Sequence, residues 1–224
     1  ESSEHLEART VELEDKQRRD ALTGLYNRGY LDRFLMQEFA SASRENGFLS
    51  VVFADLDRFK LINDTLGHSV GDQVLIEVGR RFLDTLRPVD YAGRIGGDEF
   101  ILLLPDITDR AEIEAIARRV LAAIEKPFIL NNRAYFLSAS IGVALAPSDG
   151  TDGKLLIKCA DSAMYQVKSE GRNDVRFFAG GLSDERTEQL QLASESEGPL
   201  TERGDIGHRR EHGEVVPGHD ESLT

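Results

Sequence analysis

The sequence of 224 residues has one cysteine, no tryptophan and no apolar run near the roughly 20 residues that a membrane-spanning helix needs. A single cysteine excludes an internal disulfide. Because Cys159 lies in an apolar helical pattern, we expect it to be a buried structural thiol. No signal-peptide pattern opens the sequence. These scarcities favour a cytoplasmic protein with no membrane span in this part of the chain.

Positive charge is also scarce, because 27 Lys and Arg stand against 40 Asp and Glu and give a net charge of −13. The acidic excess lies mainly in residues 182–224, which contain 11 acidic and 4 basic side chains. Binding to a nucleic acid polymer needs clustered Lys and Arg that neutralise phosphates, so this composition argues against it. A nucleotide substrate stays open if a divalent cation mediates.

The two ends of the chain differ in composition from its middle. Residues 1–19 are polar and helix-forming, with Leu6 and Leu13 one heptad apart. They fit either a coiled coil from a missing upstream sensor domain or a solvated helical linker. Residues 180–224 combine low hydrophobicity with high charge, which predicts a disordered polar tail. We expect one folded domain over residues 20–179.

The middle of the chain alternates helical and strand patterns. Helices are expected from just after Asn27 to about Ser43, over 71–86, from a Thr108 cap to about 125, and over 151–169. Strands are expected over 48–54, in a hairpin around 94–100, over 135–146 and over 175–178. This order predicts an α/β or α+β fold, in which helices cover one mostly antiparallel sheet.

Acidic residues follow a buried strand and also occupy a glycine turn. The strand ends in DLD (55–57), and RIGGDEF (94–100) carries Asp98 and Glu99. A solvated hairpin tip is one interpretation. The other is a cation site, because carboxylates at a buried strand end are unfavourable unless they are solvated or paired. If the strands are neighbours, Asp55 and Asp98 converge as Mg²⁺-dependent nucleotidyl transfer requires.

Two short polar side chains flank a turn further along the chain. Asp72 lies near an expected helix start, so it could cap that helix. Alternatively, Asp72 accepts hydrogen bonds from guanine N1–H and N2–H₂ while Asn63 donates to the acceptor edge. The local sequence leaves both interpretations open.

Six segments together resemble the GGDEF family, the diguanylate cyclases. They are DALTGLYNR (20–28), DLDRFKLIND (55–64), GHSVGDQVL (67–75), RPVD (87–90), RIGGDEF (94–100) and MYQVKSEGRN (164–173). Their order and spacing match the family from residue 20 to about 178. The combination is far more specific than the GGDEF motif alone.

The resemblance implies a palm-like nucleotide-cyclase sheet and the condensation of two GTP into cyclic di-GMP with release of two pyrophosphates. It implies Mg²⁺, or Mn²⁺, held by Asp55, the Leu56 carbonyl and Asp98, with Glu99 beside them. Asp98 or Glu99 would assist deprotonation of the ribose 3′-hydroxyl. Asn63 and Asp72 would bind guanine, with His68 nearby. The phosphates would be contacted, or their surroundings ordered, by Phe59, Lys60, Lys168 and Arg172. One GTP per subunit implies a catalytic homodimer.

The segment RPVD (87–90) has two interpretations. It can be a helix end followed by a proline stop. The resemblance instead implies a product-inhibition site, in which Arg87 and Asp90 bind cyclic di-GMP and Arg118 reaches a second product molecule. An arginine fork can bond guanine O6 and N7, and an aspartate the N1/N2 edge. The rival functions are an inactive cyclic di-GMP receptor and a truncated bifunctional chain that once continued into a phosphodiesterase domain.

Overall fold

The computed structural model describes residues 15–45, 47–150 and 152–180, all within a compact unit formed by residues 1–182. Its helices are α2 (Arg28–Glu45), α3 (Phe59–Leu66), α4 (His68–Thr85), α5 (Arg110–Glu125) and α6 (Gly153–Ser169). Its strands are β1 (Tyr26–Asn27), β2 (Leu49–Leu56), β3 (Tyr91–Gly96), β4 (Glu99–Pro105), β5 (Phe128–Leu130), β6 (Arg133–Tyr135), β7 (Ala139–Ala146) and β8 (Asp174–Phe177). The expected coiled coil and tail fall almost wholly outside the described residues.

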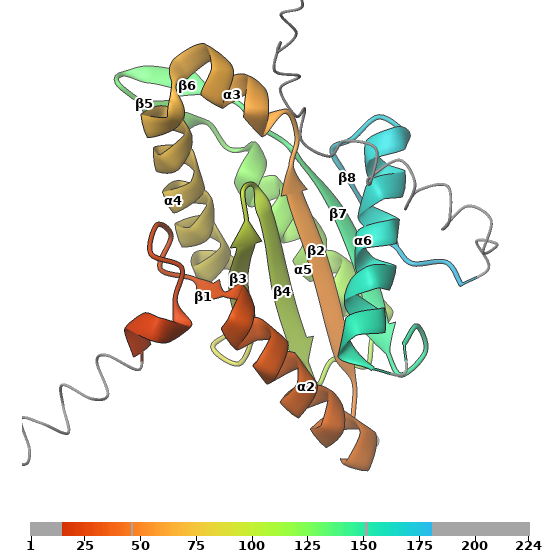
Figure 1. The fold of residues 1–224 in the computed structure, drawn as a ribbon. Helices are drawn as coiled ribbons and strands as arrows, with labels where there is room; N and C mark the ends of the chain where they lie inside the picture. The colour runs from red at the N-terminus through yellow and green to blue at the C-terminus, as the bar shows by residue number, and fades with distance from the viewer. Residues whose placement is uncertain (1–14, 46, 151, 181–224) are drawn as a thin grey trace, which may run out of the picture. The chain divides into compact units, whose positions relative to one another are not determined.

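One six-stranded sheet organises the domain, in the order β1-β3-β4-β2-β7-β8 (Figure 1). Strands β3, β4, β2 and β7 pair antiparallel, while β1 and β8 add parallel pairs at the two edges. The fold class expected from the sequence is therefore confirmed. Strand β2 lies centrally between β4 and β7, and its last residues reach the same end of the sheet as the β3–β4 hairpin.

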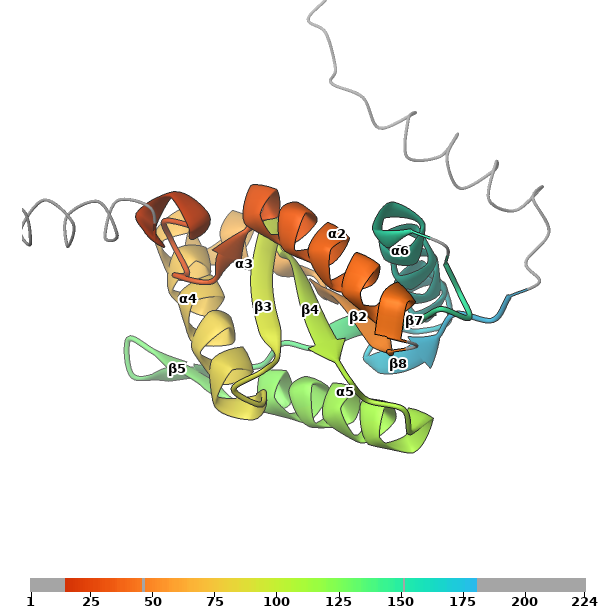
Figure 2. The same ribbon diagram turned by 90° about the horizontal axis from the view of Figure 1, so that it is seen from below.

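Helices cover both faces of this sheet (Figure 2). Side chains alternate along β2, so Val52 and Ala54 join the core with α4 and α5, whereas Val51 and Phe53 join the core with α2 and α6. Both faces are thus buried, which is why β2 is a nearly continuous apolar run. Each fully buried large apolar side chain contributes about 1.5–3 kcal/mol to this packing.

The helices depart from the sequence-based expectation in three places. Helix α3 was not expected, and α4 begins at His68 rather than at residue 71. The expected Thr108 cap of α5 is wrong, because Asp109 is the N-cap and its carboxylate accepts a hydrogen bond from the Ala111 N–H at 2.9 Å. Thr108 and Asp109 are both good capping residues, so only the backbone path decides between them.

The long strand expected over 135–146 is two strands with a break. Strand β6 ends at Tyr135 and belongs to a separate hairpin with β5, while β7 begins at Ala139. Asn131 and Asn132 connect β5 to β6, with φ of 51° and 60°. Two consecutive left-handed residues make the tight connection that a two-residue hairpin requires, and asparagine tolerates this conformation.

The expectation for the single cysteine is confirmed. Cys159 is buried on α6, and its thiol lies 3.1 Å from the Asp149 carbonyl oxygen. Burial raises the pKa of this thiol, which suits a structural rather than a reactive role. In the part of the chain that the structure describes, no helix is long and apolar enough to span a membrane.

Candidate active site

The acidic residues come together where β2 and the β3–β4 hairpin end. Asp55 of β2 is the register partner of Glu99 of β4. The backbone N–H of Leu56 donates to the Asp98 carbonyl at 3.2 Å, which ties the hairpin to the strand end. The expectation that the two strands are neighbours is therefore confirmed, and it places three carboxylates around one end of the sheet.

The hairpin tip is shaped by its glycines and by one arginine. Gly97 has φ of 50°, and a Cβ atom added at Gly96 or Gly97 would meet nothing within 4 Å. Arg94 donates to the Gly97 carbonyl at 2.8 Å and lies 3.2 Å from both carboxylate oxygens of Asp20. The hairpin tip is thus held by the Arg94 contacts, while the space next to Gly96 and Gly97 is open. No role was expected from the sequence for Arg94 or Asp20, although both lie in the segments that carry the family resemblance.

The carboxylates at this end carry unbalanced negative charge. Burial, together with nearby Asp98 and Glu99, raises the pKa of Asp55 to about 6 even though Lys168 opposes the shift. Burial and the charges of Asp161 and Asp98 raise the pKa of Glu99. A positive charge placed here would reverse both shifts, because it favours the ionised carboxylates.

Lys168 supplies part of that positive charge. It projects from the last turn of α6, and its Nζ lies 2.8 Å from Asp55 Oδ2. Asp55 is 8% exposed at its side chain and Lys168 is 29% exposed, so the pair is partly screened from water. The Lys168 ammonium group therefore balances only part of the negative charge of the carboxylates at this site.

The donor set suits a hard cation that is shared with a ligand. Within the described ranges, no three or more His, Cys, Asp or Glu side chains form a cluster ready to hold a metal ion. Mg²⁺ commonly takes only one or two protein carboxylates and leaves its other positions to phosphate oxygens and water. Asp55, the Leu56 carbonyl and Asp98 or Glu99 could supply oxygen donors of that kind, and their role as metal ligands stays a prediction.

Asn63, one of the two residues expected at guanine, lies against Gly71, the residue that precedes the other, Asp72. A Cβ atom at Gly71 would stand only 1.9 Å from Asn63 Oδ1, so glycine there lets the Asn63 side chain of α3 lie directly against α4. Asp72 follows this glycine and is exposed. The capping interpretation of Asp72 is wrong, because α4 starts at His68 with Gly67 at the N-cap. The base-reading interpretation stays a prediction.

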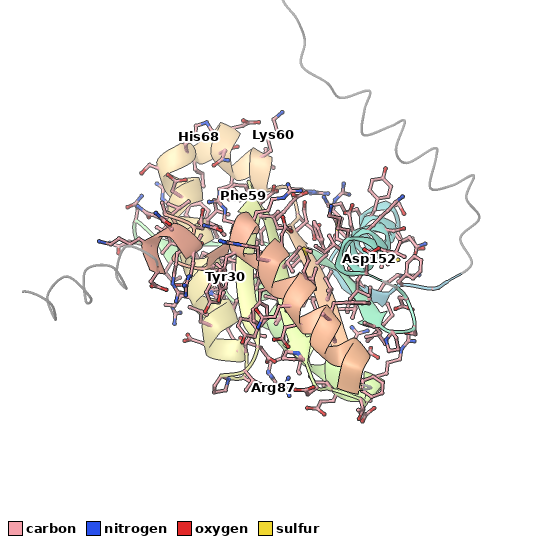
Figure 3. All side chains as sticks on the ribbon, turned by 60° about the horizontal axis from the view of Figure 1, so that its bottom comes forward. Tyr30, Phe59, Lys60, His68, Arg87 and Asp152 are labelled. Carbon is pink, nitrogen blue, oxygen red and sulfur yellow. The ribbon has the colours of Figure 1, made fainter. Side chains whose placement is uncertain are left out.

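Phe59, Lys60 and Arg172 were expected near the phosphates, and His68 was expected near the guanine. Phe59 is buried at the start of α3, whereas Lys60 and His68 are exposed and point outward in Figure 3. Arg172 follows α6 in a turn of positive φ, and its Nε lies 4.0 Å from Asp57 Oδ1. These placements are compatible with a nucleotide that spans from α3 and α4 to α6.

A further buried carboxylate, Asp57, was not assigned a role from the sequence. Its oxygens accept hydrogen bonds from Ser138 Oγ at 2.6 Å and Ser140 Oγ at 2.7 Å. Its Oδ2 also accepts from the Asn173 N–H at 3.1 Å. The DLD pattern showed two acidic residues at the strand end, but nothing local indicated that the second would be enclosed by such distant partners.

Arg87 lies at the opposite end of the described domain from Lys60 and His68 (Figure 3), and Asp90 contacts it. Arg87 bonds Asp90 through both its backbone N–H and its guanidinium, and also donates to the Pro105 carbonyl at 3.0 Å. The Asp90 side chain has no exposed surface. The two residues therefore pair with each other, and contact between Asp90 and a product guanine requires this pair to open.

Arg118 has different partners from Arg87. It lies on α5, where it donates to Glu114 at 2.8 Å and to Asp174 of β8 at 3.3 Å. Arg87 instead faces the acidic residues Asp90, Glu112 and Asp106, which raise its pKa. The inclusion of Arg118 in a product site with Arg87 stays a prediction.

Known proteins resemble the chain over the region that contains this geometry. The profile of the family "Diguanylate cyclase, GGDEF domain" matches residues 17–174. MucR of Pseudomonas aeruginosa, a bifunctional diguanylate cyclase/cyclic di-GMP phosphodiesterase, is 39% identical over 84% of this chain and 27% of its own length. The diguanylate cyclase DosC of Escherichia coli is 39% identical over 73% of this chain and 35% of its own length.

A solved structure agrees with these sequence matches. The coiled coil and GGDEF domain of DgcB from Caulobacter crescentus, solved with c-di-GMP, has a TM-score of 0.73 and 26% identity. The match covers 79% of this chain and 93% of the DgcB chain. The chain spans only about a quarter to a third of the length of MucR and DosC, so the likeness concerns one domain of them. The chain belongs to the diguanylate cyclase GGDEF-domain family.

Proposed function

We propose that this domain condenses two molecules of GTP into cyclic di-GMP and releases two pyrophosphates. The observation that carries the proposal is the pairing of Asp55 with Glu99 beside Asp98, which concentrates three carboxylates, only partly balanced by Lys168, at an open glycine turn. The family membership and the diguanylate cyclase name of DosC support it. Such a cluster is suited to hold a cation against a triphosphate.

The residues present fit Mg²⁺ or Mn²⁺. Asp55, the Leu56 carbonyl and Asp98 would hold the ion, with Glu99 beside them. When bound, the ion would neutralise charge on the triphosphate and promote loss of pyrophosphate. Asp98 or Glu99 would accept the proton of the ribose 3′-hydroxyl.

The remaining residues would bind and orient GTP. Asn63 and Asp72 would read the guanine edge, and the Asn63 side chain lies against Gly71, the residue before Asp72. Lys168, which contacts Asp55, and Arg172 would supply positive charge for binding of the phosphates. His68, Phe59 and Lys60 would line the nucleotide or its surroundings.

Catalysis requires two such sites to face each other, so the active species would be a homodimer. Each subunit would present one GTP, and each 3′-hydroxyl would attack the α-phosphate of the other. Cyclic di-GMP would also bind at Arg87 and Asp90 and slow turnover. The DgcB complex with c-di-GMP supports product binding by domains of this kind.

The decisive experiment measures formation of cyclic di-GMP and pyrophosphate from GTP and Mg²⁺ over a range of protein concentrations. We expect turnover per subunit to rise with protein concentration as dimers form. ATP should be a poor substrate, because Asp72 would face adenine without a donor, at a loss of about 1–3 kcal/mol. Binding of cyclic di-GMP without any synthesis would identify the rival function, a receptor. Equal kcat/KM for ATP and GTP would contradict the roles of Asn63 and Asp72.

A further inference from the structure

Asp57 is a buried carboxylate that the proposed reaction does not use. It lies one residue beyond β2, and its side chain is only 3% exposed. Ser138 and Ser140 direct their hydroxyls at its two oxygens, at 2.6 Å and 2.7 Å. A carboxylate enclosed to this degree must be hydrogen-bonded, because burying it unpaired is strongly unfavourable. Its oxygens therefore accept hydrogen bonds from protein donors and do not face Asp55, Asp98 and Glu99, the carboxylates proposed to bind the cation.

The third partner of Asp57 comes from the turn that follows α6. The Asn173 N–H donates to Asp57 Oδ2 at 3.1 Å. Gly171, Arg172 and Asn173 have φ of 128°, 68° and 52°. A left-handed conformation at a bulky residue such as arginine is unfavourable by about 1 kcal/mol and persists only when the surrounding structure holds it. Asp57 provides one such restraint from a distant part of the chain.

Asp57 also lies close to the charged group of Arg172. The guanidinium Nε is 4.0 Å from Asp57 Oδ1, and the arginine side chain is 44% exposed. The carboxylate thus holds the backbone after Arg172 through Asn173 and attracts its guanidinium at the same time. This arrangement keeps a positive group near the residue that follows β2, while Lys168 contacts Asp55 two residues earlier.

We propose that Asp57 is a positioning residue that fixes the turn of residues 171–173, so that Arg172 presents its guanidinium to the triphosphate of the substrate. The proposal rests on the proposed function for the identity of that substrate. An arginine side chain loses much conformational freedom when it binds phosphate, so holding it beforehand strengthens binding. Without Asp57, Arg172 would contribute little, although its side chain is still present.

A double-mutant cycle tests this coupling. Asp57→Asn, Arg172→Ala and the double variant are compared by the Kd of a non-hydrolysable GTP analogue with Mg²⁺. Each single change should weaken binding about tenfold, the scale of one lost charge-assisted hydrogen bond. The double variant should bind the GTP analogue no more weakly than the single variant that binds it less tightly. Losses that multiply to about a hundredfold would overturn the proposal, because they would mean that the two residues act independently.

Asp149→Asn is the matched control. Asp149 also accepts from a backbone N–H, that of Leu145 at 2.8 Å, and from a serine hydroxyl, that of Ser148 at 3.3 Å. It lies beyond the opposite end of β7 from Ser140. This change should lower Tm as a lost carboxylate contact does, yet leave the Kd of the GTP analogue unchanged. If Asp57→Asn does not fold, Ser140→Ala replaces it, since it removes one partner of Asp57 and keeps the charge.

Hydrogen exchange at the Asn173 amide gives a readout that does not depend on nucleotide. We expect Asp57→Asn to accelerate it at least tenfold and Asp149→Asn to leave it unchanged. Unchanged exchange in Asp57→Asn overturns the inference, whether or not the parent makes product. A parent that binds the analogue and shows the coupling but forms no cyclic di-GMP overturns the proposed function alone. A parent that binds no GTP analogue overturns both.

Discussion

Asp55 and Asp57 lie two residues apart at the end of β2, but their surroundings are opposite. Asp57 accepts hydrogen bonds from two serine hydroxyls and a backbone N–H. Asp55 has one lysine partner, and burial together with two nearby carboxylates raises its pKa to about 6. The comparison separates two uses of a buried acid. Asp57 is saturated by protein donors and holds structure, whereas Asp55 is short of positive charge and suited to bind a cation.

The largest effect is expected when a carboxylate of the proposed cation site is replaced, because the protein should then lose the synthesis of cyclic di-GMP. Asp98→Asn or Glu99→Gln should reduce turnover at least a thousandfold, because losing a metal carboxylate removes several kcal/mol of transition-state stabilisation. The fold should remain intact, as judged by circular dichroism and Tm. Asp84→Asn, which changes an exposed carboxylate on α4, is the control and should keep full activity. Near-parental turnover in a folded Asp98→Asn protein would contradict the cluster assignment.

The second effect is a pH dependence of stability in the metal-free protein. The pKa of Asp55 is about 6 in the folded state against an ordinary value of 3.8, so the folded state holds this proton more tightly. Its contribution to stability is complete below about pH 4 and is lost as the pH rises through about 6. The loss is at most about 3 kcal/mol.

Urea unfolding between pH 4 and 7 in the presence of a chelator measures this dependence. Asp55→Asn should remove that part of the slope, and added Mg²⁺ should reduce the slope in the parent. An identical slope in the parent and in Asp55→Asn would show that Asp55 is not the group responsible.

The third effect concerns stability at neutral pH. Asp57→Asn should lower the free energy of unfolding by about 1–3 kcal/mol, because buried donors lose their carboxylate acceptor. Glu99→Gln should lower it little or raise it, since burial and neighbouring acids already disfavour the charge of Glu99. Urea titrations of both variants at pH 7 test the pair. If Glu99→Gln destabilises the protein more than Asp57→Asn, the proposed difference between the stabilising Asp57 and the cation-binding carboxylates is wrong.

The smallest effect concerns regulation at Asp90, a second carboxylate whose oxygens are hydrogen-bonded by the protein. Arg87→Ala should relieve inhibition by cyclic di-GMP, raising the half-inhibitory concentration about tenfold, equal to about 1.4 kcal/mol. Turnover without product should persist, because Arg87 lies at the opposite end of the molecule from the proposed site. Initial rates with and without added product measure this. A folded but inactive variant would place Arg87 in catalysis or dimer assembly instead.

Arg118→Ala serves as the matched comparison for Arg87. If Arg118 reaches a second product molecule, its loss should also weaken inhibition. If it serves only Glu114 and Asp174, to which it is bonded, inhibition should match the parent. The outcome therefore decides whether the predicted product site extends onto α5.

Local patterns in the sequence were sufficient to predict the main elements and the convergence of acids. The apolar run before Asp55 and the glycine turn before Asp98 identify a buried strand and a hairpin, and these proved to be neighbours. The β5–β6 hairpin escaped notice because its Asn131-Asn132 turn contains no glycine or proline. The start of α4 escaped notice because the polar segment 67–70 shows little apolar periodicity.

Periodicity and motifs of fixed spacing were enough to predict the fold class, the family and the types of side chain available. Only the tertiary structure decided how two neighbouring acids differ, because the partners of Asp57 lie more than 80 residues further along the chain. It likewise decided that Asp90 is enclosed by Arg87 and that Lys168 meets Asp55. Charge and burial at a residue depend on what the fold brings next to it, and no local pattern records that.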